Sequence, residues 1–93
     1  MEQQELTLTW RGIAMQITYK QRYADTIAHL EVNTQNKQRL PITETGYRSH
    51  FTHAAEIEAY DSPIEYVQAW LEEAAKSKAW KRYETDKDQL KLF

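Results

Sequence analysis

The chain changes character at the stretch LPITETGYRSHF, residues 40–51. Before this stretch, apolar residues alternate with polar ones, which is the pattern of half-buried strands. After it, apolar residues recur every three or four positions, as they do in amphipathic helices. The stretch also contains one of the two glycines and one of the two prolines of the chain. It therefore predicts a junction between a sheet half and a helical half.

On the N-terminal side, the alternation predicts a meander of antiparallel strands. A two-residue turn at Arg11-Gly12 pairs apolar residues across the first two strands, namely Trp10 with Ile13, Leu8 with Met15 and Leu6 with Ile17. A third strand folds back so that Ala28, Leu30 and Val32 lie opposite Tyr19, Ile17 and Met15. One face of this sheet is apolar, and the other carries polar side chains that include His29, which we interpret as structural.

Leu40 and Ile42 continue the alternation and predict a short fourth strand beside Val32 and Leu30. Pro41 between them cannot donate a hydrogen bond to a neighbouring strand, so this piece is expected at an edge of the sheet.

The C-terminal side predicts two or three helices. Residues 52–60 form a short helix with Thr52 as its cap. The sequence Ser62-Pro63-Ile64-Glu65 is a capping box that starts a longer helix, whose apolar stripe is Ile64, Val67, Leu71, Ala74 and Ala75, with Trp70 at its flank. Ser77 caps a further helix over residues 78–87, which turns Trp80 and Tyr83 toward the core. The basic residues Lys76, Lys78, Lys81 and Arg82 are attributed to the helix dipole.

These elements predict an α+β fold, in which a four-stranded antiparallel meander is followed by two or three helices packed on one face in two layers. Residues 1–88 form a single domain and residues 89–93 form a tail. The 93 residues include no cysteine and no apolar run of membrane-spanning length, and the net charge is −2. We therefore expect a cytoplasmic protein with no membrane association, no cofactor and no direct nucleic-acid binding.

The candidate surface site on the junction consists of Glu44, Tyr47, Arg48 and His50. Thr43, Glu44 and Thr45 are expected mainly to satisfy backbone groups at a strand end, with Arg48 paired to an acid such as Glu44. No catalytic motif is present, so we expect no enzyme activity and assign no catalytic residue.

Two alternatives remain open at this point. One is a small-ligand or metal-binding domain that uses residues 43–56, with His50, His53 and Glu56 on one side of a helix as metal ligands. The other is an acidic inhibitor or nucleic-acid mimic. Six acids and no Lys or Arg lie between Ala54 and Ala75, namely Glu56, Glu58, Asp61, Glu65, Glu72 and Glu73. Mimicry requires those carboxylates to share one exposed surface.

The final five residues are Gln89-Leu90-Lys91-Leu92-Phe93. They resemble the pentapeptide, Gln-Leu, then Ser or Asp, then Leu-Phe, through which bacterial polymerases and repair proteins bind the DNA sliding clamp. This resemblance implies a protein partner, with Gln89, Leu90, Leu92 and Phe93 as the contact residues. The alternative is that the three apolar side chains fold back onto the domain.

Much of the chain also resembles a family of small uncharacterised bacterial proteins. The resemblance is carried by LPITETGYRSHF, by Trp10-Arg11-Gly12-Ile13, by residues 63–71 and by the Gln-Leu-x-Leu-Phe end. Members are often encoded on plasmids and integrative elements, and their tails commonly read Gln-Leu-Ser-Leu-Phe. The resemblance implies a bacterial, cytoplasmic accessory protein, and it implies no catalytic residue.

Overall fold

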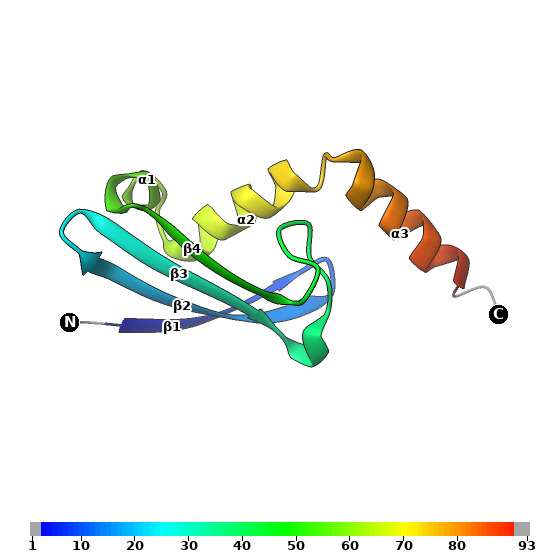
Figure 1. The fold of residues 1–93 in the computed structure, drawn as a ribbon, viewed down its shortest axis with the longest axis horizontal. Helices are drawn as coiled ribbons and strands as arrows, with labels where there is room; N and C mark the ends of the chain where they lie inside the picture. Colours follow the sequence, from blue (N-terminus) through cyan, green and yellow to red (C-terminus); the bar gives the residue numbers. More distant parts are fainter. Residues whose placement is uncertain (1–2, 91–93) are drawn as a thin grey trace.

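The structure, a computed structural model, describes residues 3–90, with side chains described through residue 87. Four strands form one antiparallel sheet in the order β1 (Gln3–Trp10), β2 (Ile13–Ala24), β3 (Ile27–Thr34) and β4 (Tyr47–His53). Three helices follow, α1 (Ala54–Glu58), α2 (Pro63–Ala74) and α3 (Lys78–Leu90) (Figure 1). This arrangement confirms the predicted α+β class.

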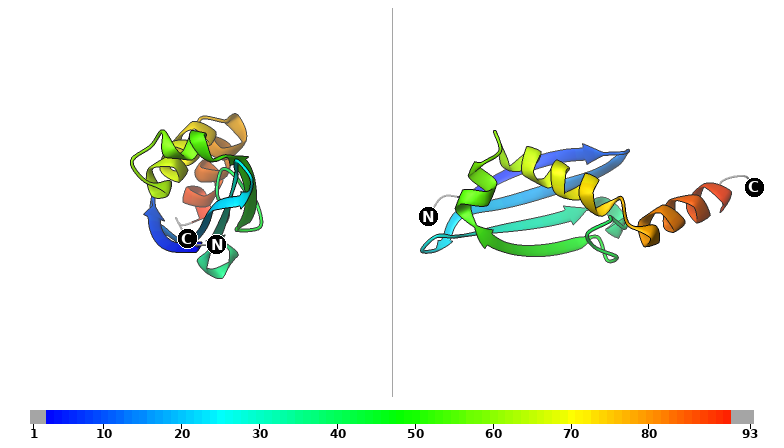
Figure 2. Two further views of the ribbon diagram at one scale, coloured as in Figure 1. Left: turned by 90° about the vertical axis from the view of Figure 1, so that its left-hand side faces the viewer. Right: turned by 90° about the horizontal axis from the view of Figure 1, so that it is seen from above.

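The helices leave one face of the sheet uncovered. Figures 1 and 2 show α1 and α2 on the same face, while α3 continues past the end of the sheet. The molecule is accordingly elongated, with extents of 50 × 23 × 20 Å. Among the helices of residues 3–90, none has the length and apolarity that crossing a membrane requires.

The first hairpin has the predicted register, with Trp10 opposite Ile13, Leu8 opposite Met15 and Leu6 opposite Ile17. Both turn residues have positive φ, 48° at Arg11 and 81° at Gly12, as a two-residue hairpin turn of the primed type requires.

The register between β2 and β3 differs from the predicted one by two residues, since Ile17 lies opposite Val32 and Tyr19 opposite Leu30. The reason is that β2 continues to Ala24 and the turn is short, whereas the predicted pairing left residues 21–26 as a polar connection between the two strands. An irregularity between Lys20 and Ala24 accompanies this change. A shift of two leaves every side chain on its predicted face, so the apolar face is unchanged.

The prediction of the fourth strand was wrong. Leu40 and Thr43 close a tight turn instead, in which their N–H groups donate to each other's carbonyls at 2.8 and 3.1 Å. Strand β4 lies further along the chain and pairs with β3 from Tyr47, opposite Asn33, to His53, opposite Ile27. Seven paired residues provide a longer ladder than a strand interrupted by Pro41. Leu40 and Ile42 are still buried, at 1% and 9% exposure.

Gly46 fixes the loop before β4 against the end of β3. Its φ is 85°, and a Cβ atom there would lie 2.5 Å from the Oγ1 of Thr34 and 2.8 Å from the backbone of Lys37. The carbonyl of Gly46 accepts the Thr34 N–H at 2.8 Å. This position therefore requires glycine both for its conformation and for its space.

The helices begin close to their predicted starts. α1 begins at Ala54 with His53 as its N-cap, because Phe51 and Thr52 belong to β4 rather than to a helix. The Oγ of Ser62 accepts the Glu65 N–H at 3.3 Å at the start of α2, as predicted. Trp80, at 3% exposure, joins α3 to the core and packs 5.9 Å from Trp10 between ring centroids.

Candidate functional site

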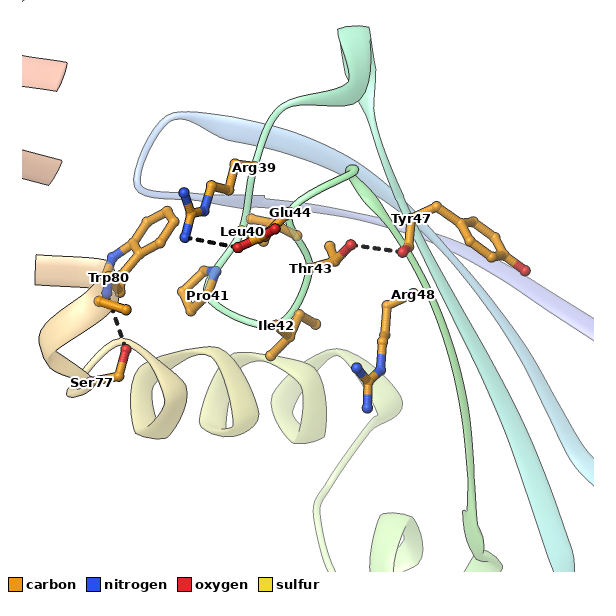
Figure 3. Close-up of a pocket in the computed structure, with 11 residues that line it drawn as sticks. Arg39, Leu40, Pro41, Ile42, Thr43, Glu44, Tyr47, Arg48, Ser77 and Trp80 are labelled. Atoms are coloured by element: carbon orange, nitrogen blue, oxygen red, sulfur yellow. Dashed lines mark hydrogen bonds and ion pairs between the residues drawn. The ribbon is translucent and has the colours of Figure 1, made fainter. Parts of the chain in front are cut away.

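A pocket of about 470 Å³ opens where the loop before β4 meets the junction between α2 and α3 (Figure 3). Its lining comes from residues 39–44 of the loop, from Tyr47 and Arg48 at the start of β4, and from Ser77, Ala79 and Trp80 at the start of α3. Two parts of the chain that lie about thirty residues apart in sequence therefore form its walls.

Hydrogen bonds within the loop give it a defined shape. The hydroxyl of Thr43 donates to the carbonyl of Tyr47 at 2.8 Å and accepts the Thr45 N–H at 3.2 Å. On the opposite wall, the Oγ of Ser77 accepts the Trp80 N–H at 3.1 Å and caps α3, as predicted. The two threonines and Ser77 thus satisfy backbone groups, which confirms the structural interpretation of Thr43 and Thr45.

The two arginines of the pocket have different environments. Arg39 lies 3.5 Å from the carboxylate of Glu44 and 4.6 Å from the ring centroid of Tyr83. Arg48 lies 5.7 Å from the ring centroid of Trp70 and forms no ion pair with any side chain that the structure describes. The predicted pair of Arg48 with Glu44 is therefore wrong, and the uncompensated charge of the pocket is positive.

The structure separates the predicted site residues. Glu44, Tyr47 and Arg48 line the pocket, but the phenol of Tyr47 points away from it, and its hydroxyl donates to Glu31 (Figure 3). This hydrogen bond to Glu31 is the largest cause of the raised pKa of Tyr47. Arg39, Ser77 and Trp80 complete the pocket, and sequence reasoning did not assign any of them to a site.

His50 lies outside the pocket, on the face of β4 that α2 covers. Its Nε2 is 3.0 Å from the hydroxyl of Tyr66, and its ring centroid is 4.3 Å from that of Trp70. Burial holds the pKa of His50 below its ordinary value, and the positive charge of Arg48 lowers this pKa further.

The comparison with protein families matches the part of the chain that forms this site. A family model described as the KlcB third domain matches residues 3–80. The chain belongs to the KlcB third domain family. Comparison with curated proteins and with solved structures finds no significant match. In this KlcB third domain, the match includes the sheet, α1, α2 and every pocket residue, whereas residues 81–93 lie beyond it.

The proposed metal ligands do not converge in this KlcB third domain. His50 and His53 are three residues apart on a strand, so their side chains face opposite sides of the sheet, whereas the prediction placed them on a helix. The carboxylate of Glu56 instead accepts a hydrogen bond from Thr52. Among the described residues, no group of three or more potential ligands gathers.

The acidic run from Ala54 to Ala75 is divided among different neighbours. Glu58, in α1, accepts a hydrogen bond from Gln21 of β2. Glu72, near the end of α2, accepts the indole N–H of Trp10 at 2.7 Å, and this bond is the main cause of its lowered pKa. Glu73 pairs with Lys76 at 3.0 Å. These carboxylates stabilise contacts within the domain, so the geometry does not favour the nucleic-acid mimic.

An aromatic cluster lies on the uncovered face of the sheet. Phe51 stacks on His29 with their centroids 4.3 Å apart, and Tyr23 contacts Phe51 edge-on at 5.2 Å. Tyr23 and Phe51 are 47% and 52% exposed. Sequence reasoning missed this cluster because it placed Phe51 in the junction before the helices and Tyr23 in the connection between the second and third strands, and not on strands of the sheet.

His29 also lies 2.7 Å from the hydroxyl of Ser49, through its Nε2. A serine and a histidine in contact resemble a nucleophile and its base, but catalysis also requires a group that orients the ring and donors for an oxyanion. The contact joins β3 to β4 across the flat sheet face, and no other side chain hydrogen bond to His29 is found among the described residues. The contact therefore links two neighbouring strands of the sheet.

Two of the four predicted clamp-binding residues lie beyond the described part of the chain. Gln89 and Leu90 belong to the last turn of α3, so this helix runs across the predicted boundary at residue 88. Leu92 and Phe93 lie outside the described residues.

Proposed function

We propose that this chain is a protein-interaction module without catalytic activity that docks on the bacterial DNA sliding clamp. The observation that carries the proposal is the sequence Gln-Leu-Lys-Leu-Phe at residues 89–93, which fits the clamp-binding pentapeptide at every position except Lys91. As the family resemblance implies, the setting is the bacterial cytoplasm and a gene carried on a mobile element.

The chemistry of the pentapeptide suits this role. Leu92 and Phe93 are large apolar side chains that fill a hydrophobic pocket, and Gln89 supplies hydrogen bonds at its rim. A few buried apolar anchors provide most of the affinity in peptide recognition of this kind. Lys91 stands where Ser or Asp is usual, and we expect this position to face solvent in the complex.

The position of α3 supports the proposal. The helix extends beyond the end of the sheet, so its last turn, which contains Gln89 and Leu90, lies away from the sheet (Figure 1). The family match ends at residue 80, so residues 89–93 lie beyond it. Docking in an extended conformation requires Gln89 and Leu90 to leave the last helical turn. Because helix ends fray readily, this opening has a small free-energy cost.

A binding titration with purified sliding clamp tests the proposal. We expect the full chain to bind, and we expect Leu92→Ala and Phe93→Ala each to weaken binding by about 30-fold, the effect of losing an anchor worth about 2 kcal/mol. Lys91→Ala is the matched control and should bind like the unaltered chain. Equal binding by a chain that lacks residues 89–93, or no binding by the full chain, would overturn the proposal.

A further inference from the structure

We propose that the pocket in Figure 3 binds a carboxylate side chain from an acidic segment of a partner protein. Arg39 and Arg48 reach this pocket from the loop and from β4, and the start of α3 closes it. The inference is independent of residues 89–93, because all of the lining residues lie within residues 39–80.

Arg48 and Ser77 each offer a hydrogen-bond donor to the pocket. Arg48 keeps its full donor capacity toward carboxylates, since none of the described side chains forms an ion pair with it. The Oγ of Ser77 already accepts the Trp80 N–H, so its hydroxyl hydrogen is left to donate to a ligand. A guanidinium and a hydroxyl are both groups from which a carboxylate oxygen accepts hydrogen bonds.

The surrounding charge is also positive. The basic residues after Ala75 were attributed to the negative, C-terminal end of one long helix. This attribution fails for the residues from Lys78 onward, because the chain breaks between α2 and α3 at residues 75–77. Lys78, Lys81 and Arg82 therefore lie near the positive end of α3, and its first turn contains no acidic residue. Cations at this end of a helix raise the local positive potential. That potential is complementary to an acidic partner.

Glu44 shows that the site accommodates a carboxylate. Its carboxylate lies 3.5 Å from Arg39 while its side chain remains 81% exposed, so the pair is weakly held and easily displaced. An incoming acidic side chain would compete with Glu44 for Arg39. Removal of Glu44 should therefore strengthen binding, an outcome that damage to the fold cannot imitate.

A protein segment fits better than a polyanion such as nucleic acid. The pocket volume of about 470 Å³ and the apolar surface of Pro41 suit a side chain with aliphatic carbons. The chain as a whole has a net charge of −2, which opposes the approach of a long phosphate backbone.

Fluorescence anisotropy with a labelled octaglutamate peptide at low ionic strength tests the proposal. We expect Arg48→Gln and Arg39→Gln to weaken binding by about five- to tenfold, as for the loss of one ordinary solvent-exposed hydrogen bond. Glu44→Gln should tighten binding. Arg22→Gln is the control, because it removes the same charge from a residue that lines a different pocket with Asp25 and His53. A chain lacking residues 89–93 should bind the peptide normally.

Three outcomes would overturn the proposal. The first is equal weakening by Arg22→Gln and Arg48→Gln, which indicates a diffuse charge effect. The second is Glu44→Gln without any gain in affinity. The third is displacement of the peptide by inorganic phosphate or by oligothymidine as effectively as by unlabelled octaglutamate, which would assign the site to phosphates or nucleic acid. Amide chemical shifts of Ser77 and Ala79 that move on peptide addition would support the assignment directly.

Discussion

At the scale of single residues, Gly46 and Gly12 share a positive φ but differ in their surroundings. Gly46 is enclosed by Thr34 and Lys37, whereas a Cβ atom on Gly12 would meet nothing within 4 Å. We expect Gly12→Ala to lower the free energy of unfolding by about 1–2 kcal/mol, the cost of a left-handed conformation for alanine. Gly46→Ala should cost more, because steric overlap with backbone adds to that strain.

Urea unfolding of both variants measures this difference. Equal losses for Gly12→Ala and Gly46→Ala would show that the loop before β4 relaxes freely, and would contradict the rigid pocket wall described above.

His50 and Arg48 provide a second test at this scale. Arg48→Gln should raise the pKa of His50, but not to its ordinary value, because burial is the larger cause of the lowered pKa. A lowered pKa in the folded state means that protonation favours unfolding. Stability should therefore fall as the pH drops from the ordinary histidine pKa of about 6.5 toward the lower pKa of the folded state.

Titration of the His50 ring by NMR measures this pKa in the unaltered chain and in Arg48→Gln, with Arg22→Gln as the control. A pKa of His50 that is unchanged or lower in Arg48→Gln would indicate that the charge of Arg48 is neutralised in solution.

At the scale of elements, the sequence predicts the strand pairings and helix starts that are set by residues close together in the chain. The register of β1 with β2 follows from three apolar pairs and from Gly12, and both capped helices follow from Ser62 and Ser77. β4 was missed because its inward residues Arg48, His50 and Thr52 are polar and face aromatic side chains of α2 rather than aliphatic core. Such a strand shows no apolar alternation.

The pocket was only partly predictable for a related reason. Glu44, Tyr47 and Arg48 are close in sequence, and their polar density indicated a surface feature. Their partners from the start of α3 are about thirty residues away, and only the turn between α2 and α3 brings Ser77 and Trp80 to the same place. The place of Arg39 in the pocket could not be predicted from its neighbours in sequence, since it depends on contacts with Glu44 and Tyr83.

The break between α2 and α3 can be tested through its cap. Ser77→Ala removes the acceptor of the Trp80 N–H and should lower the free energy of unfolding by about 1 kcal/mol, the usual effect of losing an N-cap. Ser77→Gly should cost less, because glycine is tolerated at this position. Urea denaturation compares the variants. If Ser77→Ala unfolds at the same urea concentration as the unaltered chain, the cap does not determine where α3 begins.

At the scale of the whole molecule, the fold consists of a packed body and a projecting helix. The body buries the apolar face of the sheet beneath α2, through fully buried residues such as Ile17, Leu30 and Leu71. α3 joins this body near its start, through Trp80, Tyr83 and the ion pair of Glu84 with Arg11. Its later turns point away from the sheet (Figure 2).

Hydrogen exchange should report this division. We expect the slowest amide exchange in the central strands β2 and β3, and faster exchange in α3 after Glu84, because a helix without tertiary packing opens locally. Mass spectrometry of exchanged peptides makes the comparison, with the first turn of α3 as the internal reference. Uniform protection along all of α3 would show that the whole helix is packed against a partner or a second copy.

The central claim, docking on the sliding clamp through residues 89–93, is tested most directly by competition. A labelled Gln-Leu-Ser-Leu-Phe peptide is bound to purified clamp, and the full chain is added. The account predicts that the full chain displaces the peptide, and that a chain with Leu92→Ala and Phe93→Ala does not. If the full chain leaves the labelled peptide bound at concentrations at which the unlabelled peptide displaces it, the claim is contradicted.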